Sequence, residues 1–155
     1  MFAVGLSMVN PFDLRTILLA KHAQHVVLIH FPIALFTIGV LFDLLSRGKQ
    51  ASQLATAAYL NLSVAAGAVL PTYATGLLAW HFALAGARLT GVILFHFVAA
   101  SCTVLLVLLS WWMHWRARKS ESLPLPPYRI PIELLGVAVI TLTGHLGGFL
   151  SGVNT

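Results

Sequence analysis

Four long apolar runs, separated by short polar connections, constrain this chain more than any other feature of its sequence. Each run can cross a bilayer as a helix, because a hydrocarbon core of about 30 Å needs about 20 helical residues. Hydrophobic residues make up 59% of the chain and charged residues 8%, whereas a soluble domain carries roughly a quarter charged residues. The pattern predicts an all-α membrane protein, a four-transmembrane up-down antiparallel helix bundle with a short N-terminal interfacial segment.

The chain divides into two parts, residues 1–23 and residues 24–153. Polar and proline residues interrupt the first part, which also lacks the charge pattern and cleavage site of a signal peptide. We expect it to lie at the membrane surface as an amphipathic segment. The second part is the four-helix transmembrane domain, with spans expected near residues 24–46, 54–85, 89–115 and 131–151.

Prolines fall inside two of the expected spans. Pro32 removes a backbone donor opposite the carbonyl of Leu28, which predicts a kink in the first span. Pro131 fits the first turn of the fourth span, where a missing donor costs nothing. Pro71 lies inside the second span, and the neighbouring polar side chains are expected to satisfy the backbone groups that it frees. These side chains are Thr72, Tyr73 and Thr75.

The net charge of +5 indicates membrane topology and not nucleic-acid binding, because the nine Lys and Arg residues are scattered between apolar runs. The more positive face is expected to be cytoplasmic. Both termini are then periplasmic in a bacterial inner membrane. The expected cytoplasmic charges are Arg47, Lys49, Arg116, Arg118, Lys119 and Arg129, beside an aromatic belt of Trp111, Trp112 and Trp115. The opposite face carries Arg15, Lys21 and Arg88.

One histidine falls near the outer end of every expected span. His30 and His96 lie near the starts of the first and third spans, and His81 and His145 lie near the ends of the second and fourth. Because alternate helices run in opposite directions, all four reach the same side, on the order of 6 to 10 Å below the outer edge. Ionisable residues inside a bilayer usually face the bundle interior. The sequence therefore predicts a layer of imidazoles facing one shared site.

The remaining polar residues of the spans are expected to have simpler roles. His25 and His22 lie just above the histidine layer, and His114 is expected to be an interfacial ring among the tryptophans. Asp43 and Arg47 are four residues apart, a spacing that predicts an ion pair on one helix face.

Three uses of the histidine layer remain open: packing through hydrogen bonds, proton or metal-ion handling, and cofactor binding. A zinc or copper site prefers three or four closely spaced ligands, often with carboxylate or thiolate help. No carboxylate lies in the outer half of any span, since Asp43 and Glu133 are at the other end. Cys102, the only cysteine, is deeper than the layer.

Haem b needs only two facing histidines and an apolar slot. Diagonal helices of an up-down bundle leave room for such a ring, so the candidate ligand pairs are His30 with His96 and His81 with His145. Either one or two haems are expected. Covalently attached haem c is excluded within this chain, because no CxxCH motif is present.

Small residues and one basic residue accompany the layer. Gly144, Gly148 and Gly152 recur every four residues, which predicts a close helix contact or room for a porphyrin edge beside His145. Arg88 can pair with a haem propionate or remain a solvated interfacial charge.

The chain resembles a family of small bacterial membrane proteins, domain of unknown function 2231, over roughly residues 24–153. The resemblance is carried by "HVVLIHFPIALFTIGVLFDLL", by Thr75-Gly76, by the region of His96 and by "TGHLGGFLSGV". Val26 replaces the proline that commonly follows the first histidine in the family, and Phe149-Leu150-Ser151 replaces a usual Leu-Val-Tyr. The resemblance implies a four-helix membrane domain with histidines on the outer side. Fusion of some members to haem c or Rieske modules suggests redox work.

These observations predict a b-type cytochrome-like electron-transfer subunit of a larger respiratory or photosynthetic complex. It would act between a quinol, or another membrane partner, and an external haem c or iron–sulfur carrier. No catalytic constellation is present, which favours an electron-transfer subunit over an independent enzyme. The alternatives are a non-catalytic assembly subunit and a metal-ion or proton pathway.

Overall fold

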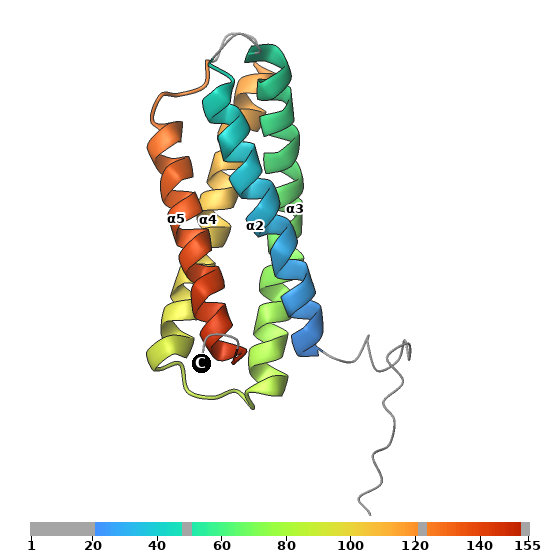
Figure 1. Cartoon of the computed structure of the whole chain (residues 1–155), viewed down its shortest axis with the longest axis vertical. Helices are drawn as coiled ribbons and strands as arrows, with labels where there is room; N and C mark the ends of the chain where they lie inside the picture. The colour runs from blue at the N-terminus through green and yellow to red at the C-terminus, as the bar shows by residue number, and fades with distance from the viewer. Residues whose placement is uncertain (1–20, 48–50, 121–123, 153–155) are drawn as a thin grey trace, which may run out of the picture.

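The computed structural model describes residues 21–47, 51–120 and 124–152, and these residues form four long helices (Figure 1). Each helix is long and apolar enough to cross a membrane, so the predicted all-α four-span fold is confirmed. The helices are α2 (Lys21–Leu45), α3 (Ala51–Ala83), α4 (Gly91–Lys119) and α5 (Arg129–Leu150). The first helix begins at residue 21, within the expected interfacial segment, and the rest of that segment lies outside the described residues.

The helices alternate in direction (Figure 1), and the contacts between them form a closed ring. Each helix packs on its neighbours in the chain, most extensively α2 on α3, and a smaller contact between α2 and α5 completes the ring. Helix α2 therefore lies diagonally opposite α4, and α3 lies opposite α5, as the up-down topology predicts. We call the end that holds the start of α2 and the end of α5 the terminal end. The other end, where α2 leads to α3 and α4 to α5, is the loop end.

The core lies along the bundle axis and is built from side chains of all four helices. Phe36 of α2, Leu62 of α3, Val107 of α4 and Ile140 of α5 are almost fully buried in one cluster. Large apolar side chains also cover the outside of the bundle, where Leu105 is 67% exposed. A soluble protein does not expose so much apolar surface, whereas a helix facing lipid does.

The proline inside α2 is accommodated by a partner on the neighbouring helix. Both α2 and α3 continue through their prolines. The Thr72 hydroxyl lies 2.8 Å from the Ala68 carbonyl oxygen in the turn before Pro71, as expected from the sequence. It also lies 3.3 Å from the carbonyl oxygen of Leu28, which Pro32 leaves without its usual amide donor. The other two side chains of that expectation have different partners, because Tyr73 bonds Ser101 and Thr75 bonds the Thr72 carbonyl.

The two hairpins, α2–α3 and α4–α5, repeat one another at an interval of 71 residues. Adding 71 to the numbers of the buried Phe36 and Val69 gives the equally buried Val107 and Ile140. The repeat is parallel, since α2 and α4 run in the same direction, and it places an approximate two-fold axis along the bundle. Residues that differ by 71 in number therefore occupy equivalent places around this axis.

Gly136 lets helix α5 approach the core, and this contact generates a prediction. A Cβ at Gly136 would lie 2.7 Å from Cζ of Phe36, which is fully buried. Gly136→Ala should lower the free energy of unfolding by about 1–3 kcal/mol, the usual cost of overpacking. Thermal or SDS-induced unfolding in detergent micelles measures the change.

Gly67→Ala is the matched control, because a Cβ at Gly67 meets no atom within 4 Å. This variant should be neutral or more stable by up to about 1 kcal/mol, owing to the higher helix propensity of alanine. Equal stability of the two alanine variants would contradict the packing described here.

Candidate cofactor cavity and buried ionic cluster

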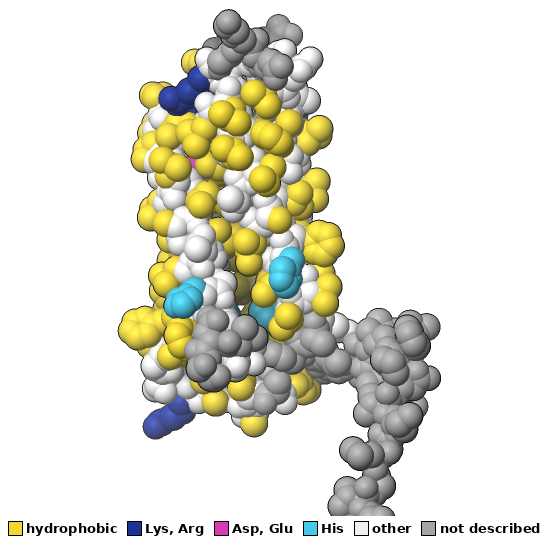
Figure 2. Space-filling view, viewed as in Figure 1, with side chains coloured by type: hydrophobic (Ala, Val, Ile, Leu, Met, Phe, Trp, Pro, Cys, Tyr) yellow, Lys and Arg dark blue, Asp and Glu magenta, His cyan; other side chains and the backbone are white. Residues whose placement is uncertain are grey.

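A cavity of about 390 Å³ lies towards the terminal end of the bundle and is lined by all four helices. This volume falls within the range of about 300–1,000 Å³ typical of small-molecule sites. Most of the lining is apolar, and its titratable side chains include His25, His30 and His96. Figure 2 shows histidine side chains on the viewed face of the bundle, all in the half that holds the terminal end.

His25 and His96 occupy equivalent positions on the diagonal helices α2 and α4. Nδ1 of His25 lies 3.1 Å from the carbonyl oxygen of Thr72, and Nδ1 of His96 lies 3.1 Å from that of Thr143. Each bond joins residues 47 apart in the chain. Because a carbonyl oxygen only accepts, Nδ1 carries the hydrogen in both rings, and Nε2 of the neutral ring is left with a lone pair. Metal-binding histidines are typically held in this way.

A glycine faces each of these two rings from the second helix of its hairpin. A Cβ at Gly76 would lie 2.9 Å from Cε1 of His25, and a Cβ at Gly147 would lie 3.3 Å from Cε1 of His96. Gly76 and Gly147 differ by 71 in number, like the two histidines. The close approach of each imidazole to α3 or α5 therefore depends on the missing side chain at that position.

His30 is a third imidazole of the cavity wall. Its Nδ1 donates to the Val26 carbonyl of the same helix at 2.8 Å, although the side chain is exposed at the cavity edge. The structure therefore brings three of the predicted residues, His25, His30 and His96, to one cavity.

The structure corrects the predicted layer at its other two positions. His81 and His145 are exposed, do not line the cavity, and contact Phe82 and Phe149 edge-on at 4.8 and 5.0 Å between ring centroids. They lie in the terminal-end half of the bundle, but the rotation of α3 and α5 turns them out of it. The expected ligand pair of His81 with His145 is therefore not formed around the cavity.

Two further residues of the predicted site have different placements. Arg88 is exposed in the α3–α4 connection and does not line the cavity. The side chain of His22 lies outside the described part of the chain.

Two of the three glycines of the predicted four-residue repeat line the cavity. Gly144 and Gly148 line it, whereas Gly152 lies beyond the end of the helix at a φ of 76°. Gly147, which faces His96, was not singled out by the sequence pattern because it is off the four-residue repeat.

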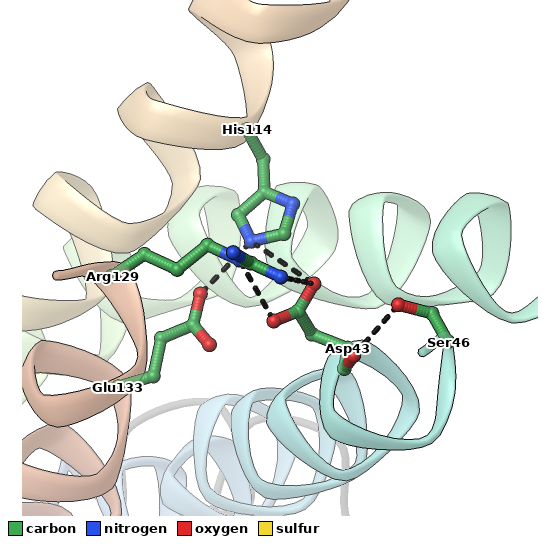
Figure 3. A network of polar contacts seen from close by, with 5 residues as sticks. All are labelled: Asp43, Ser46, His114, Arg129 and Glu133. Carbon is green, nitrogen blue, oxygen red and sulfur yellow. Dashed lines mark hydrogen bonds and ion pairs between the residues drawn. The ribbon is translucent and has the colours of Figure 1, made fainter. Parts of the chain in front are cut away.

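A second polar site is buried between the helices towards the loop end (Figure 3). Arg129 donates to both oxygens of Asp43, with its Nε 2.9 Å from Oδ2 and its Nη2 3.3 Å from Oδ1. Nε2 of His114 lies 2.8 Å from Oε1 of Glu133 and 3.9 Å from Oδ1 of Asp43. All four side chains are buried. We call these residues the ionic cluster.

The ionic cluster overturns three expectations from the sequence. Asp43 pairs with Arg129 and not with Arg47, which is exposed. His114 is 3% exposed and is not an interfacial ring. Arg129, counted among the charges of the cytoplasmic face, is a buried ion-pair partner. The first turn of α5 packs beside the end of α2, which brings Arg129 to Asp43. These residues are 86 apart in the chain, so the local sequence pattern does not reveal the pair.

Three groups of the ionic cluster have the spacing of metal ligands. One ligand atom each from Asp43, His114 and Glu133 lies within 4.8 Å of the others. However, the guanidinium of Arg129 already binds both oxygens of Asp43 and lies among these side chains in Figure 3. A cation placed there would be repelled by this neighbouring positive charge, so the geometry favours an ion-pair network over a metal centre.

Comparison with known proteins assigns the chain at the level of a family. The family described as predicted membrane protein DUF2231 matches residues 21–153. The chain has no match among curated proteins or among solved structures.

The buried ion pair generates a prediction about stability. Arg129→Met should lower the free energy of unfolding by about 3–5 kcal/mol, because it leaves the Asp43 carboxylate buried without its partner. Arg47→Ala removes an exposed arginine from the same end and should change stability by less than about 0.5 kcal/mol. SDS titration of both variants in micelles tests this, and a similar cost for both would mean that Arg47 is the partner of Asp43.

Proposed function

Since the chain belongs to the DUF2231 family of predicted membrane proteins, we propose that it is a membrane subunit that binds haem b in the cavity of the terminal end, with His25 and His96 as the axial ligands. One observation carries the proposal: two imidazoles in equivalent positions on diagonal helices donate Nδ1–H to a backbone carbonyl and border the same cavity. This revises the pair expected from the sequence, because His25 and not His30 is the counterpart of His96.

The donor set fits a haem. Bis-imidazole ligation needs two neutral rings with the lone pair on Nε2, and the carbonyl bonds of Thr72 and Thr143 fix that tautomer. Gly76 and Gly147 leave room for the rings close to α3 and α5, and most of the cavity wall is apolar. When bound, haem b supplies one-electron redox chemistry. The role of the chain is then to position the ligands and set the polarity around them.

Orientation and partners belong to the same proposal. The four spans imply a lipid bilayer environment. Arg47, Arg116, Arg118 and Lys119 gather at the loop end, which makes that end cytoplasmic by the positive-inside rule. The cavity would then face the periplasmic side of a bacterial inner membrane. There it would exchange electrons with a quinol or membrane partner and an external haem c or iron–sulfur carrier, within a larger complex. Arg88, at the same end, is available to a haem propionate.

A second function is favoured by the same hydrogen bonds. Each of them ties the first helix of a hairpin to the second, so the two histidines also act as clamps between helices. A subunit that uses them only in this way would serve assembly of a larger membrane complex and bind no cofactor.

A reduced-minus-oxidised optical spectrum of the purified full chain, produced with sufficient haem, tests the primary proposal. The sharp α-band of a low-spin haem is expected in the wild type and should be lost in His25→Ala and in His96→Ala. His81→Ala and His145→Ala are the matched controls, because their exposed rings do not line the cavity, and both should retain the band.

Three results would count against haem ligation by this pair. A folded protein without haem or metal favours the assembly function. Stoichiometric zinc or copper that disappears in His25→Ala indicates a metal site. A band that survives loss of His25 but not of His30 restores the pair expected from the sequence.

The glycines that face the two histidine rings, Gly76 and Gly147, give a further prediction. Gly76→Ala places a Cβ 2.9 Å from the ring of His25, so the imidazole must shift, and misplaced ligands weaken metal sites about 10–100-fold. Haem titration of the apoprotein should show a loss of this order for Gly76→Ala. The effect should be smaller for Gly147→Ala, where the contact is 3.3 Å, and absent for Gly67→Ala. An unchanged haem affinity in Gly76→Ala would mean that His25 is not an axial ligand.

A further inference from the structure

The ionic cluster contains two acids but only one permanent cation. Asp43 and Glu133 are acids, Arg129 is a permanent cation, and His114 is either neutral or cationic. With both carboxylates ionised and a neutral imidazole, the cluster has a net charge of −1. All four residues are at most 9% exposed, and an uncompensated charge at such a position costs several kcal/mol.

The surroundings supply no other charge to balance this excess within the described residues. Helix α3 contributes the buried Leu62 at the position equivalent to Glu133, and no residue of α3 takes part in the ion pairs of the cluster among the described residues. The basic residues of the last turns of α4 have other partners outside it: Arg116 lies over Trp112, Arg118 over Tyr59 and Lys119 over Trp115. Arg47 of α2 is exposed.

We propose that the ionic cluster is a binding site for one proton, held by the His114–Glu133 pair. One added proton brings the net charge to zero, whether it makes the imidazole a cation or the carboxylate an acid. The 2.8 Å bond between His114 Nε2 and Glu133 Oε1 allows either arrangement. Because the two groups share the proton, it belongs to the pair and not to one residue.

An unpartnered oxygen gives independent support. The side chain of Glu133 is fully buried. Its Oε2 has no hydrogen-bond partner among the described residues. In Figure 3 this second oxygen points away from His114. Carboxylate oxygens of Asp43 and Glu133 lie within 4.8 Å of one another, so two ionised carboxylates there would repel. A proton in the pair removes this repulsion.

The charge count also selects a proton over a divalent cation. A divalent ion would change the net charge from −1 to +1, beside the guanidinium of Arg129, and would leave the same magnitude of buried charge. A proton leaves none. The site lies at the loop end, remote from the histidine cavity, so the proposal does not depend on haem binding. It gives the bundle a titratable interior group that faces the opposite side of the membrane from the proposed haem.

Infrared spectroscopy of the wild-type chain in micelles at neutral pH provides the first test. Either a protonated carboxyl band that is absent from Glu133→Gln, or a doubly protonated His114 imidazole in ¹⁵N NMR, supports the proposal. If the wild type has neither signal, the proposal is overturned. Stoichiometric divalent metal in the purified protein that Glu133→Gln does not retain also overturns it.

The pH dependence of unfolding provides the second test. Above about pH 7.5 an unfolded chain holds almost no proton on this histidine or glutamate, whereas the folded cluster holds one. The unfolding equilibrium constant should therefore rise about tenfold per pH unit until the folded cluster loses its proton. The matched control is Glu133→Gln, which keeps the shape and the hydrogen bond to His114 but is neutral without a proton.

Glu133→Gln should lack the tenfold slope, and the other histidines cancel in the difference between the two proteins. Equal slopes would overturn the proposal. Should this variant not fold, Asp43→Asn combined with Arg129→Gln removes one charge of each sign. That double variant keeps the net charge of −1 and must retain the slope; a flat pH dependence there would contradict the charge count.

Discussion

Every polar group inside these four apolar helices must find its partner within the bundle, because lipid offers none. An unsatisfied polar group in hydrocarbon costs several kcal/mol, and this constraint accounts for the cross-helix bonds of the structure. Thr72 donates to the carbonyl that Pro32 frees. His25 and His96 bond carbonyls of neighbouring helices, and Arg129 crosses from α5 to Asp43 of α2. These bonds fix the rotation of each helix as well as its position.

The two ends of the bundle meet the same constraint in different ways. At the loop end, charges of opposite sign are packed together and water is excluded. Towards the terminal end the imidazoles border an open volume of about 390 Å³. The hairpin repeat links the ends, since Asp43 and His114 are equivalent positions, as are His25 and His96. In the ionic cluster the two equivalent residues are an acid and a base, whereas at the cavity both are histidines. A symmetric pair of ligands suits a planar cofactor, whereas an acid and a base suit a proton.

The fold could be predicted from the sequence because bilayer thickness imposes a length on each span, and composition alone reveals it. The end of the bundle at which the histidines gather could also be predicted, since it depends only on the alternating direction of the helices. The direction in which each ring points could not be predicted. His81 and His96 lie in the same half of the bundle, yet one contacts Phe82 on the outside and the other bonds Thr143 inside. The 47-residue spacing that His25–Thr72 shares with His96–Thr143 is a signal that a search for internal repeats could have found.

The sequence by itself determined the number of spans, their antiparallel order and the end of the bundle at which histidines gather, because these follow from local composition and helix geometry. The tertiary structure decided which imidazoles face the cavity and which carboxylate meets Arg129. Those choices depend on the rotation of each helix about its own axis. The rotation is set by contacts such as Gly136 with Phe36 and Gly76 with His25, between residues distant in the chain. Local hydropathy does not encode them.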